Sequence, residues 1–245
     1  MQVVWFNHKS EEVEADSKTL SICSLNINGM TESKAVCLRE VLLKKMYDII
    51  ALQETWNTTH RKIDLADFTS SHIIRQSLHK NATRGSGGIS FHINKNSNIK
   101  TKILKSHDDF IVWVNIQDGR ELDVAICFVY FPPEGSTCNP SREDYFDVLT
   151  EDIRELKEQF PLIIMGDFNA RTGSLSDSCY DVDGSDNPSD PNPNLSDSDI
   201  FQPHLQTVRQ SEDSVSANSY GRKLVDLCRS AGLCILNGRV GDKLG

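Results

Sequence analysis

The chain has 245 residues and a formal net charge of −9 at pH 7, and its composition excludes three classes of protein. No apolar run approaches the roughly 20 residues needed to cross a bilayer, and residues 1–9 lack the basic start and apolar stretch of a signal peptide. Seven scattered cysteines form no Cys-x-x-Cys pair, which argues against a zinc site or a disulfide framework. We therefore expect a soluble intracellular protein of the nucleus or cytoplasm, without a membrane partner.

The first half of the chain predicts mainly strands. Residues 1–17 are polar and irregular, and we expect them to form a loosely attached lead-in to a folded domain at 18–245. Thr31 begins a helix whose apolar residues recur with a 3.6-residue period. Residues 57–83 are rich in loop-forming residues. Strands are expected at 20–26, 49–52, 89–93 and 110–114, from apolar runs or from alternation of apolar and polar residues.

The second half predicts strands, two helices and one long loop. An amphipathic helix begins at Ser141, with apolar residues four and three apart, and a second helix at 222–231 ends at Gly232. Residues 174–216 have too few apolar side chains for a packed element, so we interpret them as a loop insertion. Further strands are expected at 122–130, 162–165 and 233–236. This mixed order favours an α+β fold, in which two sheets pack face to face with helices outside.

The negative charge is concentrated in that acidic insertion. Residues 174–213 contain nine acidic residues against Arg209 alone, and so account for −8 of the net charge of −9. The remainder of the chain is nearly neutral. The net charge therefore does not exclude a partner such as DNA, whose phosphates a uniformly acidic surface would repel.

Three apolar, strand-like runs end in polar side chains that suit phosphate chemistry. The first delivers Asn26 and Asn28, the second Glu54, and the third Asp167 and Asn169. A carboxylate and an amide at one rim of a sheet can position a water molecule and a phosphate. Two alternatives remain open, namely an Asx-rich turn after the last strand and a surface glutamate that caps a loop.

Four motifs in this order resemble the endonuclease/exonuclease/phosphatase superfamily, which has the deoxyribonuclease-I-like fold. They are Leu25-Asn-Ile-Asn-Gly29, Leu52-Gln-Glu-Thr55, Val129-Tyr-Phe-Pro-Pro133 and Gly166-Asp-Phe-Asn169. Three further segments narrow the resemblance to the apurinic-type endonuclease domain of non-LTR (LINE-like) retrotransposons, over residues 18–245. They are Arg84-Gly-Ser-Gly-Gly-Ile89, 218–228 and 233–239. The resemblance implies a four-layer αββα sandwich of two mixed sheets.

The resemblance also implies roles for these side chains in Mg2+-dependent phosphodiester hydrolysis, with Mn2+ as an alternative ion. Glu54 is expected to bind the metal, Asp167 to orient and deprotonate the attacking water, and Asn169 to fix the phosphate. Asn26 is expected to hold this network by hydrogen bonds. Asn28 lies where relatives carry a residue near the metal, although its neutral amide attracts a cation less than a carboxylate would. Magnesium prefers hard oxygen ligands and needs only one or two protein carboxylates, so this set suits it.

Two further residues have both a functional and a structural interpretation. Tyr130 matches the tyrosine that contacts the scissile phosphate in the resembled family, but a strand-end aromatic can equally seal the core. The resemblance favours the functional interpretation of Tyr130. Arg84 could bind a DNA phosphate, or it could be an ordinary exposed charge in a turn.

Members of the resembled family continue with an aspartate after a strand and then a Ser-Asp-His motif, and no Ser-Asp-His occurs in these 245 residues. We expect a domain incomplete at its C-terminus, with its last strands missing. The first hypothesis is a DNA-nicking endonuclease of retrotransposon origin, impaired by this loss, whose intact element carries a reverse transcriptase domain in the same polypeptide. The second is an inactive remnant with only a metal- or phosphate-binding pocket. A lipid or phosphoinositide phosphatase is the third, disfavoured by the match at 218–237.

Overall fold

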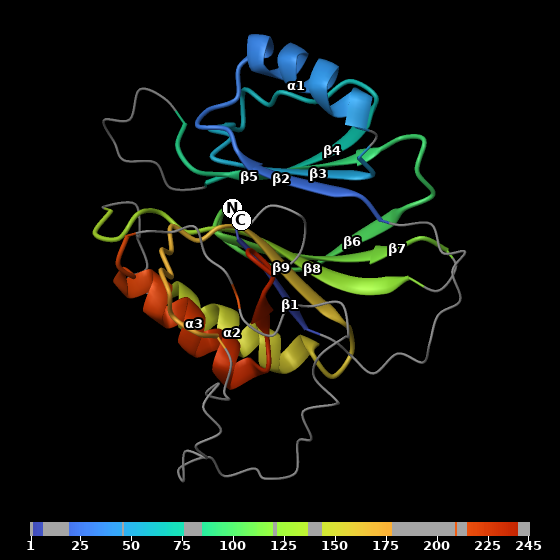
Figure 1. Cartoon of the computed structure of the whole chain (residues 1–245). Helices are drawn as coiled ribbons and strands as arrows, with labels where there is room; N and C mark the ends of the chain where they lie inside the picture. Colours follow the sequence, from blue (N-terminus) through green and yellow to red (C-terminus); the bar gives the residue numbers. More distant parts are fainter. Residues whose placement is uncertain are drawn as a thin grey trace, which may run out of the picture.

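The computed structural model describes residues 2–6, 20–45, 47–75, 85–119, 122–136, 144–177, 209 and 215–239. Two β-sheets pack face to face; one helix covers the outer face of the smaller sheet, and two helices cover the outer face of the larger sheet (Figure 1). This arrangement confirms the predicted α+β fold and its αββα layers. Within the described ranges, no helix is long and apolar enough to cross a membrane.

The larger sheet has six strands in the order β10-β1-β9-β8-β7-β6. Its strands are β1 (Gln2–Phe6), β6 (Lys100–His107), β7 (Ile111–Gln117), β8 (Asp123–Tyr130), β9 (Leu162–Asp167) and β10 (Cys234–Ile235). β8 and β9 are parallel, and the other neighbouring pairs are antiparallel. Because β8 and β9 are parallel and in register, their last residues, Tyr130 and Asp167, are paired at the same end of the sheet.

The smaller sheet has four strands in the order β2-β3-β5-β4. Its strands are β2 (Ile22–Asn26), β3 (Ile49–Gln53), β4 (Phe68–Ile73) and β5 (Ile89–Asn94). β2 and β3 are parallel, whereas β5 is antiparallel to both β3 and β4. Asn26 pairs with Gln53, so the chain leaves β2 and β3 at the same end of this sheet.

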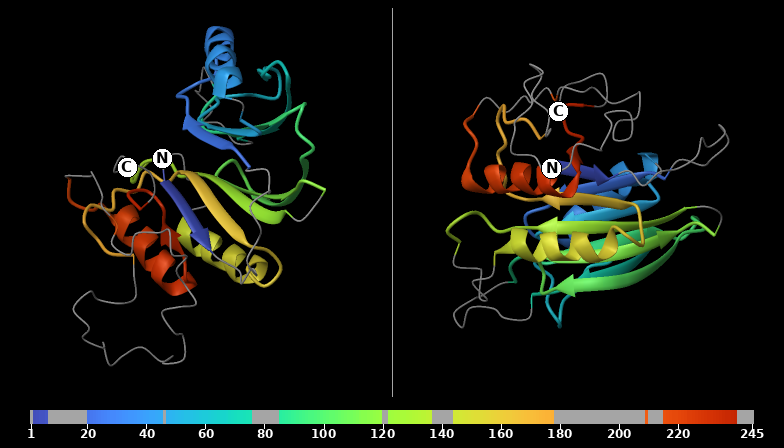
Figure 2. Two further views of the ribbon diagram at one scale, coloured as in Figure 1. Left: turned by 45° about the vertical axis from the view of Figure 1, so that its right-hand side comes forward. Right: turned by 90° about the horizontal axis from the view of Figure 1, so that it is seen from below.

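Three helices form the outer layers. α1 (Glu32–Lys45) lies over the smaller sheet, and α2 (Tyr145–Leu156) and α3 (Ser219–Ala231) lie side by side over the larger sheet (Figures 1 and 2). The Asp144 side chain caps α2 by accepting a hydrogen bond from the Phe146 N–H at 3.0 Å. The predicted end of the last helix at Gly232 is confirmed, because this glycine adopts a left-handed φ of 69°. The helix start predicted at Ser141 lies outside the described residues.

The core lies between the two sheets and is built from strands that are apolar along most of their length. All of β3 is buried, and so is β8 apart from its first residue. Phe91 of β5 stacks on Phe128 of β8 with ring centroids 6.0 Å apart, which joins the two sheets directly. Burial of one phenylalanine side chain contributes roughly 2–3 kcal/mol. This packing fixes how the ends of the two sheets face each other.

Three strands differ from the sequence prediction. The irregular lead-in predicted for residues 1–17 is wrong at residues 2–6, where β1 pairs with β9 on one side and β10 on the other (Figure 2). Five residues carry too little periodicity to reveal a strand, and the partners of β1 lie more than a hundred residues away in sequence. β4 lies inside the segment that was predicted to be loop-rich, and β6 was not predicted because its polar residues, including three lysines, hide the alternation.

The predicted acidic insertion begins later than expected. Asp177 is buried, accepts a hydrogen bond from the Ile235 N–H at 2.6 Å, and forms an ion pair with the buried Arg239. The packed body therefore extends through Asp177 and is tied there to β10. Residues 178–208 and 210–214, the greater part of the predicted insertion, lie outside the described residues.

A polar layer covers the outer face of the smaller sheet. His92 of β5 points to this face, since it alternates with the core residue Phe91. Its Nδ1 hydrogen-bonds with the Ser70 hydroxyl at 2.7 Å, and Nε2 finds no partner within the described part of the chain. Burial, with a smaller effect of His72, lowers the pKa of His92 from 6.5 to about 3. The folded protein therefore keeps this imidazole neutral.

We expect His92 to make the protein acid-sensitive. The unfolded chain binds a proton at this residue below pH 6.5 while the folded chain does not until about pH 3, so stability is complete above pH 6.5 and is lost as the pH falls towards 3. Between pH 7 and pH 5, His92→Asn should lose about 2 kcal/mol less unfolding free energy than the parent chain. Urea denaturation at both pH values measures this difference. The exposed His60, changed to Asn, is the control, and equal losses in the parent chain and His92→Asn would contradict the prediction.

Candidate active site

The ends of four strands meet where the two sheets face each other. Asn26 ends β2, Glu54 follows β3, and Tyr130 and Asp167 end β8 and β9. Each pair comes from parallel neighbours in one sheet, so its two members leave the sheet at the same end. The packing of sheet on sheet then brings the two pairs together. The three polar strand ends predicted from the sequence therefore lie in one place.

The Asn26 amide joins the two carboxylates. Its Nδ2 donates one hydrogen bond to Glu54 Oε1 at 2.9 Å and another to Asp167 Oδ2 at 2.8 Å. The carboxylates only accept hydrogen bonds when ionised, so the two N–H groups of one amide suit the position between them. Asn26 Oδ1 accepts a hydrogen bond from the Asn28 N–H at 3.0 Å, which fixes the orientation of the amide.

Tyr130 completes this network from the larger sheet. Its ring is buried, and its hydroxyl lies near the Glu54 carboxylate. Burial, followed by the nearby Glu54 carboxylate, raises the pKa of Tyr130 above its ordinary value. The phenol is therefore neutral at physiological pH and is a hydrogen-bond donor. The residue packs its ring into the core, and its hydroxyl lies near the Glu54 carboxylate, so the structural interpretation does not compete with the functional one.

Asp167 and Asn169 are joined in a tight turn after β9. The Asn169 N–H donates to Asp167 Oδ1 at 3.0 Å, and Asn169 itself adopts a left-handed φ of 48°. The Asn169 amide donates to the Phe131 carbonyl at 2.7 Å. The backbone is thus the Asx-type turn that the sequence left open as an alternative. The turn does not replace a functional role, because it holds one Asp167 oxygen while Asn26 holds the other.

A glycine is required just before this turn. Gly166 has a φ of 140°, and a Cβ added there would lie 2.1 Å from the Val129 carbonyl oxygen. Only glycine allows β9 to approach β8 this closely. The Gly-Asp pair of the sequence motif therefore has a steric cause, since the missing side chain lets Asp167 lie beside Tyr130.

Within the described residues, the Asn28 side chain does not join the carboxylate network. Asn28 is exposed, and within the described residues it takes part through its backbone, whose N–H binds Asn26 and whose carbonyl accepts from Lys34 Nζ at 3.0 Å. Arg84 lies outside the described residues. The turn that follows it, 85–88, does lie beside the site: the Gly87 carbonyl accepts from the Trp56 N–H at 2.9 Å.

The sequence analysis missed two other features next to the site. Lys34 Nζ donates to the carbonyls of Ile27, Asn28 and Gly29 and so stabilises the turn after β2. Arg75 and Asp109 form a buried ion pair beneath the glycine-rich turn. Neither belongs to a motif of the sequence, and the residues of the ion pair are 34 positions apart.

The oxygen donors present fit a hard divalent cation. Glu54 and Asp167 are two carboxylates held by one amide, and Mg2+ needs no more than one or two protein carboxylates besides water and substrate oxygens. The described residues contain no cluster of three or more His, Cys, Asp or Glu side chains that could hold a metal on their own. This donor set therefore suits Mg2+ or Mn2+ shared with a substrate, and it does not suit a structural zinc ion.

Comparison with known proteins decides the family. A model of the Endonuclease/Exonuclease/phosphatase family matches residues 23–198. The chain belongs to this family. The matched range contains Asn26, Glu54, Tyr130 and Asp167, so the network described above lies inside the family domain. A search of curated proteins gave no match.

Several solved structures are distantly similar to the chain. The catalytic domain of human Nocturnin, with a bound sulfate anion, is 15% identical with a TM-score of 0.45, over 62% of this chain and 64% of that chain. The endonuclease domain of TRAS1, a telomere-specific non-LTR retrotransposon, is 15% identical with a TM-score of 0.42, over 62% and 61%. The Neisseria 3′ phosphatase NExo, bound to a product DNA hairpin, is 16% identical with a TM-score of 0.45, over 66% and 62%. The family member described here thus spans less than two thirds of each of these structures.

We expect Asn26→Asp to destabilise the protein through repulsion between carboxylates in the site. The change keeps the shape but replaces two donors by a third carboxylate, which should lower the unfolding free energy at pH 8 by about 1–3 kcal/mol. The loss should shrink as the pH falls, because protonation removes the repulsion between like charges, and millimolar Mg2+ should reverse part of it. Thermal unfolding with and without Mg2+ measures both effects. Asn26→Leu, which adds no charge, is the matched control, and an Asn26→Asp protein indistinguishable from the parent at every pH would rule out the bridge.

Proposed function

We propose that this family member is a Mg2+-dependent phosphodiester hydrolase that nicks DNA. The observation that carries the proposal is the Asn26 amide, which holds the Glu54 and Asp167 carboxylates together beside the Tyr130 hydroxyl. One carboxylate to bind a cation, a second to orient water, and a neutral donor for phosphate form a set suited to phosphodiester hydrolysis.

Each residue has a defined task in this proposal. A divalent cation, when bound, supplies positive charge that offsets the phosphate and the leaving oxygen. Glu54 would hold that cation, while the Tyr130 O–H would donate a hydrogen bond to a phosphate oxygen. Asp167 accepts a hydrogen bond from the attacking water. Because Asn26 and the Asn169 N–H hold its two oxygens, Asp167 would contribute mainly by positioning this water.

Asn169 is proposed to contact the phosphate. A hydrogen bond from Asn218 holds its backbone in place. The Asn218 side chain donates to the Asn169 carbonyl at 2.9 Å and accepts from the Arg171 N–H at 2.9 Å. The same side chain caps α3 through the Gly221 N–H at 2.8 Å. A helix start is thereby fastened to the turn that carries Asp167 and Asn169, so this turn is held from both sides.

We further propose a retrotransposon origin, with DNA as the partner and a reverse transcriptase domain in the same polypeptide of the intact element. The support is the sequence resemblance at 84–89, 218–228 and 233–239. The contact of Asn218 with the active-site turn adds a physical reason for that segment to accompany the catalytic motifs. The proposed place of action is inside the cell, in the nucleus or the cytoplasm.

A plasmid-nicking assay tests the proposal. The chain should convert supercoiled plasmid to nicked circles in Mg2+ or Mn2+ and stop when EDTA is added. Asp167→Asn should reduce the initial rate by at least about 100-fold, the usual effect of removing a catalytic acid–base group. Glu54→Gln should raise the Mg2+ concentration that gives half the maximal rate. Glu151→Gln, an exposed acid on α2, is the control and should leave both values unchanged.

Other outcomes separate the alternatives. Full nicking by Asp167→Asn would refute the catalytic assignment. An intact plasmid combined with a Mg2+-dependent rise in melting temperature, absent from Glu54→Gln, would favour a pocket that binds metal without turnover. Release of phosphate from a phosphoinositide with the plasmid intact would favour a lipid phosphatase of the same superfamily.

A further inference from the structure

We propose that the buried Arg75–Asp109 ion pair is a positioning unit for the loop that carries Glu54, an inference that rests on the proposed function of Glu54 as a metal ligand. Neither residue belongs to the sequence motifs, and neither touches the carboxylates directly. The pair acts through the glycine-rich turn at 85–88. Five sets of contacts support this role.

The ion pair itself is buried and rigid. Arg75 Nε donates to Asp109 Oδ1 at 3.0 Å and to Oδ2 at 3.1 Å, and the two side chains are 5% and 0% exposed. The Arg75 guanidinium also stacks over the Phe110 ring, with Cζ 5.0 Å from the ring centroid. A buried ion pair of this kind stabilises a fold little, because desolvation offsets much of the attraction. A structural role in positioning is therefore the stronger explanation for its presence.

The glycine-rich turn lies directly on the pair. The Gly88 N–H donates to Asp109 Oδ2 at 2.8 Å, and Arg75 Nη1 donates to the Ser86 hydroxyl at 3.1 Å. A Cβ added at Gly87 would lie 2.1 Å from Asp109 Oδ2, so no side chain fits between the turn and the pair. The hydrogen bonds to Asp109 and Arg75, and the lack of space for a side chain at Gly87, therefore fix the position of the turn.

The glycine-rich turn also forms backbone hydrogen bonds to the loop after β3. The Gly88 carbonyl accepts from the Thr55 N–H at 3.2 Å, and the Gly87 carbonyl accepts from the Trp56 N–H at 2.9 Å. Glu54 and Trp56 adopt left-handed φ angles of 53° and 55°. Such conformations persist only where surrounding contacts impose them. The two hydrogen bonds to the glycine-rich turn are contacts of this kind.

The loop after β3 also supports the rest of the site. The Glu54 carbonyl accepts from the Gly29 N–H at 2.7 Å, and the Thr55 carbonyl accepts from the Met30 N–H at 2.8 Å. A displacement of this loop would therefore shift the turn after β2 together with Asn26. The pair thus influences the Glu54 carboxylate and its amide partner through one continuous set of hydrogen bonds.

A second route leads from the pair to Tyr130. The residue after Asp109 is Phe110, whose carbonyl accepts from the Tyr130 N–H at 2.9 Å. Arg75 also lies close enough to lower the pKa of Tyr130, against the larger raising effects of burial and Glu54. The pair is therefore in contact with segments from both sheets at the point where the site is assembled.

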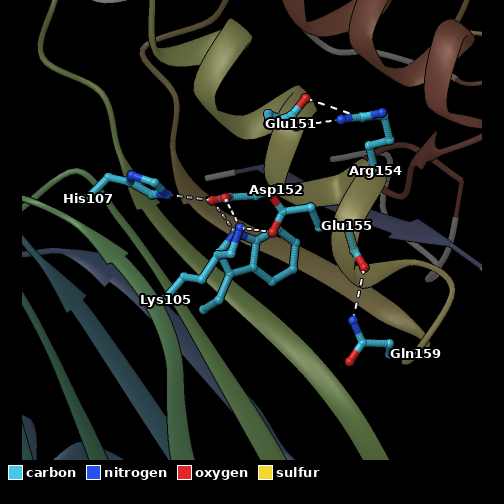
Figure 3. A network of polar contacts seen from close by, with 8 residues as sticks. Lys105, His107, Glu151, Asp152, Arg154, Glu155 and Gln159 are labelled. Carbon is cyan, nitrogen blue, oxygen red and sulfur yellow. Dashed lines mark hydrogen bonds and ion pairs between the residues drawn. The ribbon is translucent and has the colours of Figure 1, made fainter.

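The chain contains a matched control for this inference. Asp152 of α2 is 2% exposed, like Asp109, and binds Lys105 Nζ at 3.1 Å, His107 Nε2 at 2.8 Å and Trp113 Nε1 at 2.9 Å (Figure 3). These contacts join α2 to β6 and β7 on the outer face of the larger sheet. Asp152→Asn therefore removes a comparable buried charge without touching the glycine-rich turn.

Amide hydrogen exchange tests the positioning unit without requiring activity. Asp109→Asn should speed exchange of the Thr55 and Trp56 amides by at least about tenfold, through local opening, while the amides of β8 stay protected. It should also raise the Mg2+ concentration that gives half-maximal nicking by roughly 10-fold. This is the lower end of the usual loss of metal affinity when a group that orients a metal ligand is changed. Arg75→Lys keeps the charge but replaces the two nitrogens that bind Asp109 and Ser86 by one, so it should change both values in the same direction by less. Asp152→Asn should lower the melting temperature and change neither value.

The outcomes are distinguishable. The inference is wrong if Asp109→Asn lowers the melting temperature as Asp152→Asn does but leaves the Thr55 and Trp56 amides as protected from exchange as in the parent chain. Faster exchange of those amides in a protein whose parent form does not nick DNA would refute the proposed function and leave the positioning unit in place. Equal exchange effects of Asp109→Asn and Asp152→Asn would show a general loss of stability and would also overturn it.

Discussion

The geometry of the site depends on one side-chain amide between two carboxylates. Asn26 and Glu54 come from the smaller sheet and Asp167 from the larger one, so the hydrogen bond from Asn26 to Asp167 crosses the interface between the sheets, while the bond to Glu54 stays within the smaller sheet. Two carboxylates near each other repel, and each needs donors when it leaves bulk water. The amide supplies a donor to both while adding no charge. The inter-sheet core, with Phe91 stacked on Phe128, keeps the strand ends in the register that this bridge requires.

Three of the residues predicted for the site have a strained backbone conformation. Asn28, Glu54 and Asn169 all have φ angles in the left-handed region, each directly after or near the end of a strand. An unfavourable backbone conformation at a non-glycine residue costs on the order of 1–3 kcal/mol and survives when its surroundings fix it. Here the surroundings are carbonyl and amide groups of neighbouring turns, together with Lys34 and the Arg75–Asp109 pair. The protein thus gives up some folding free energy to orient side chains in directions that regular strand geometry does not allow.

The sequence predicted the parts of the fold whose signal is local. β3 and β9 are short apolar runs that end in characteristic polar residues, and both the strands and the meeting of their ends follow from pattern and chain order. β1 was missed because its strand conformation is imposed by β9 and β10, which lie far away in the chain. The Arg75–Asp109 pair was missed for the same reason: 34 residues separate the partners, and neither stands in a motif. Local patterns therefore identified the groups proposed to do chemistry, whereas the groups that hold them became visible only through tertiary contacts.

Charge explains why a cation is central to any phosphate chemistry at this site. The described network contains two carboxylates and no partner cation among its own hydrogen bonds, since its members are Asn26, Glu54, Tyr130, Asp167 and the Asn169 backbone. Lys34 is bound to backbone carbonyls, and Arg75 is bound to Asp109. A phosphate diester that approached such a site would meet like charge at short range, where solvent and salt screen least. In the proposed function, Glu54 would hold a divalent cation whose positive charge would reverse this repulsion and attract the phosphate.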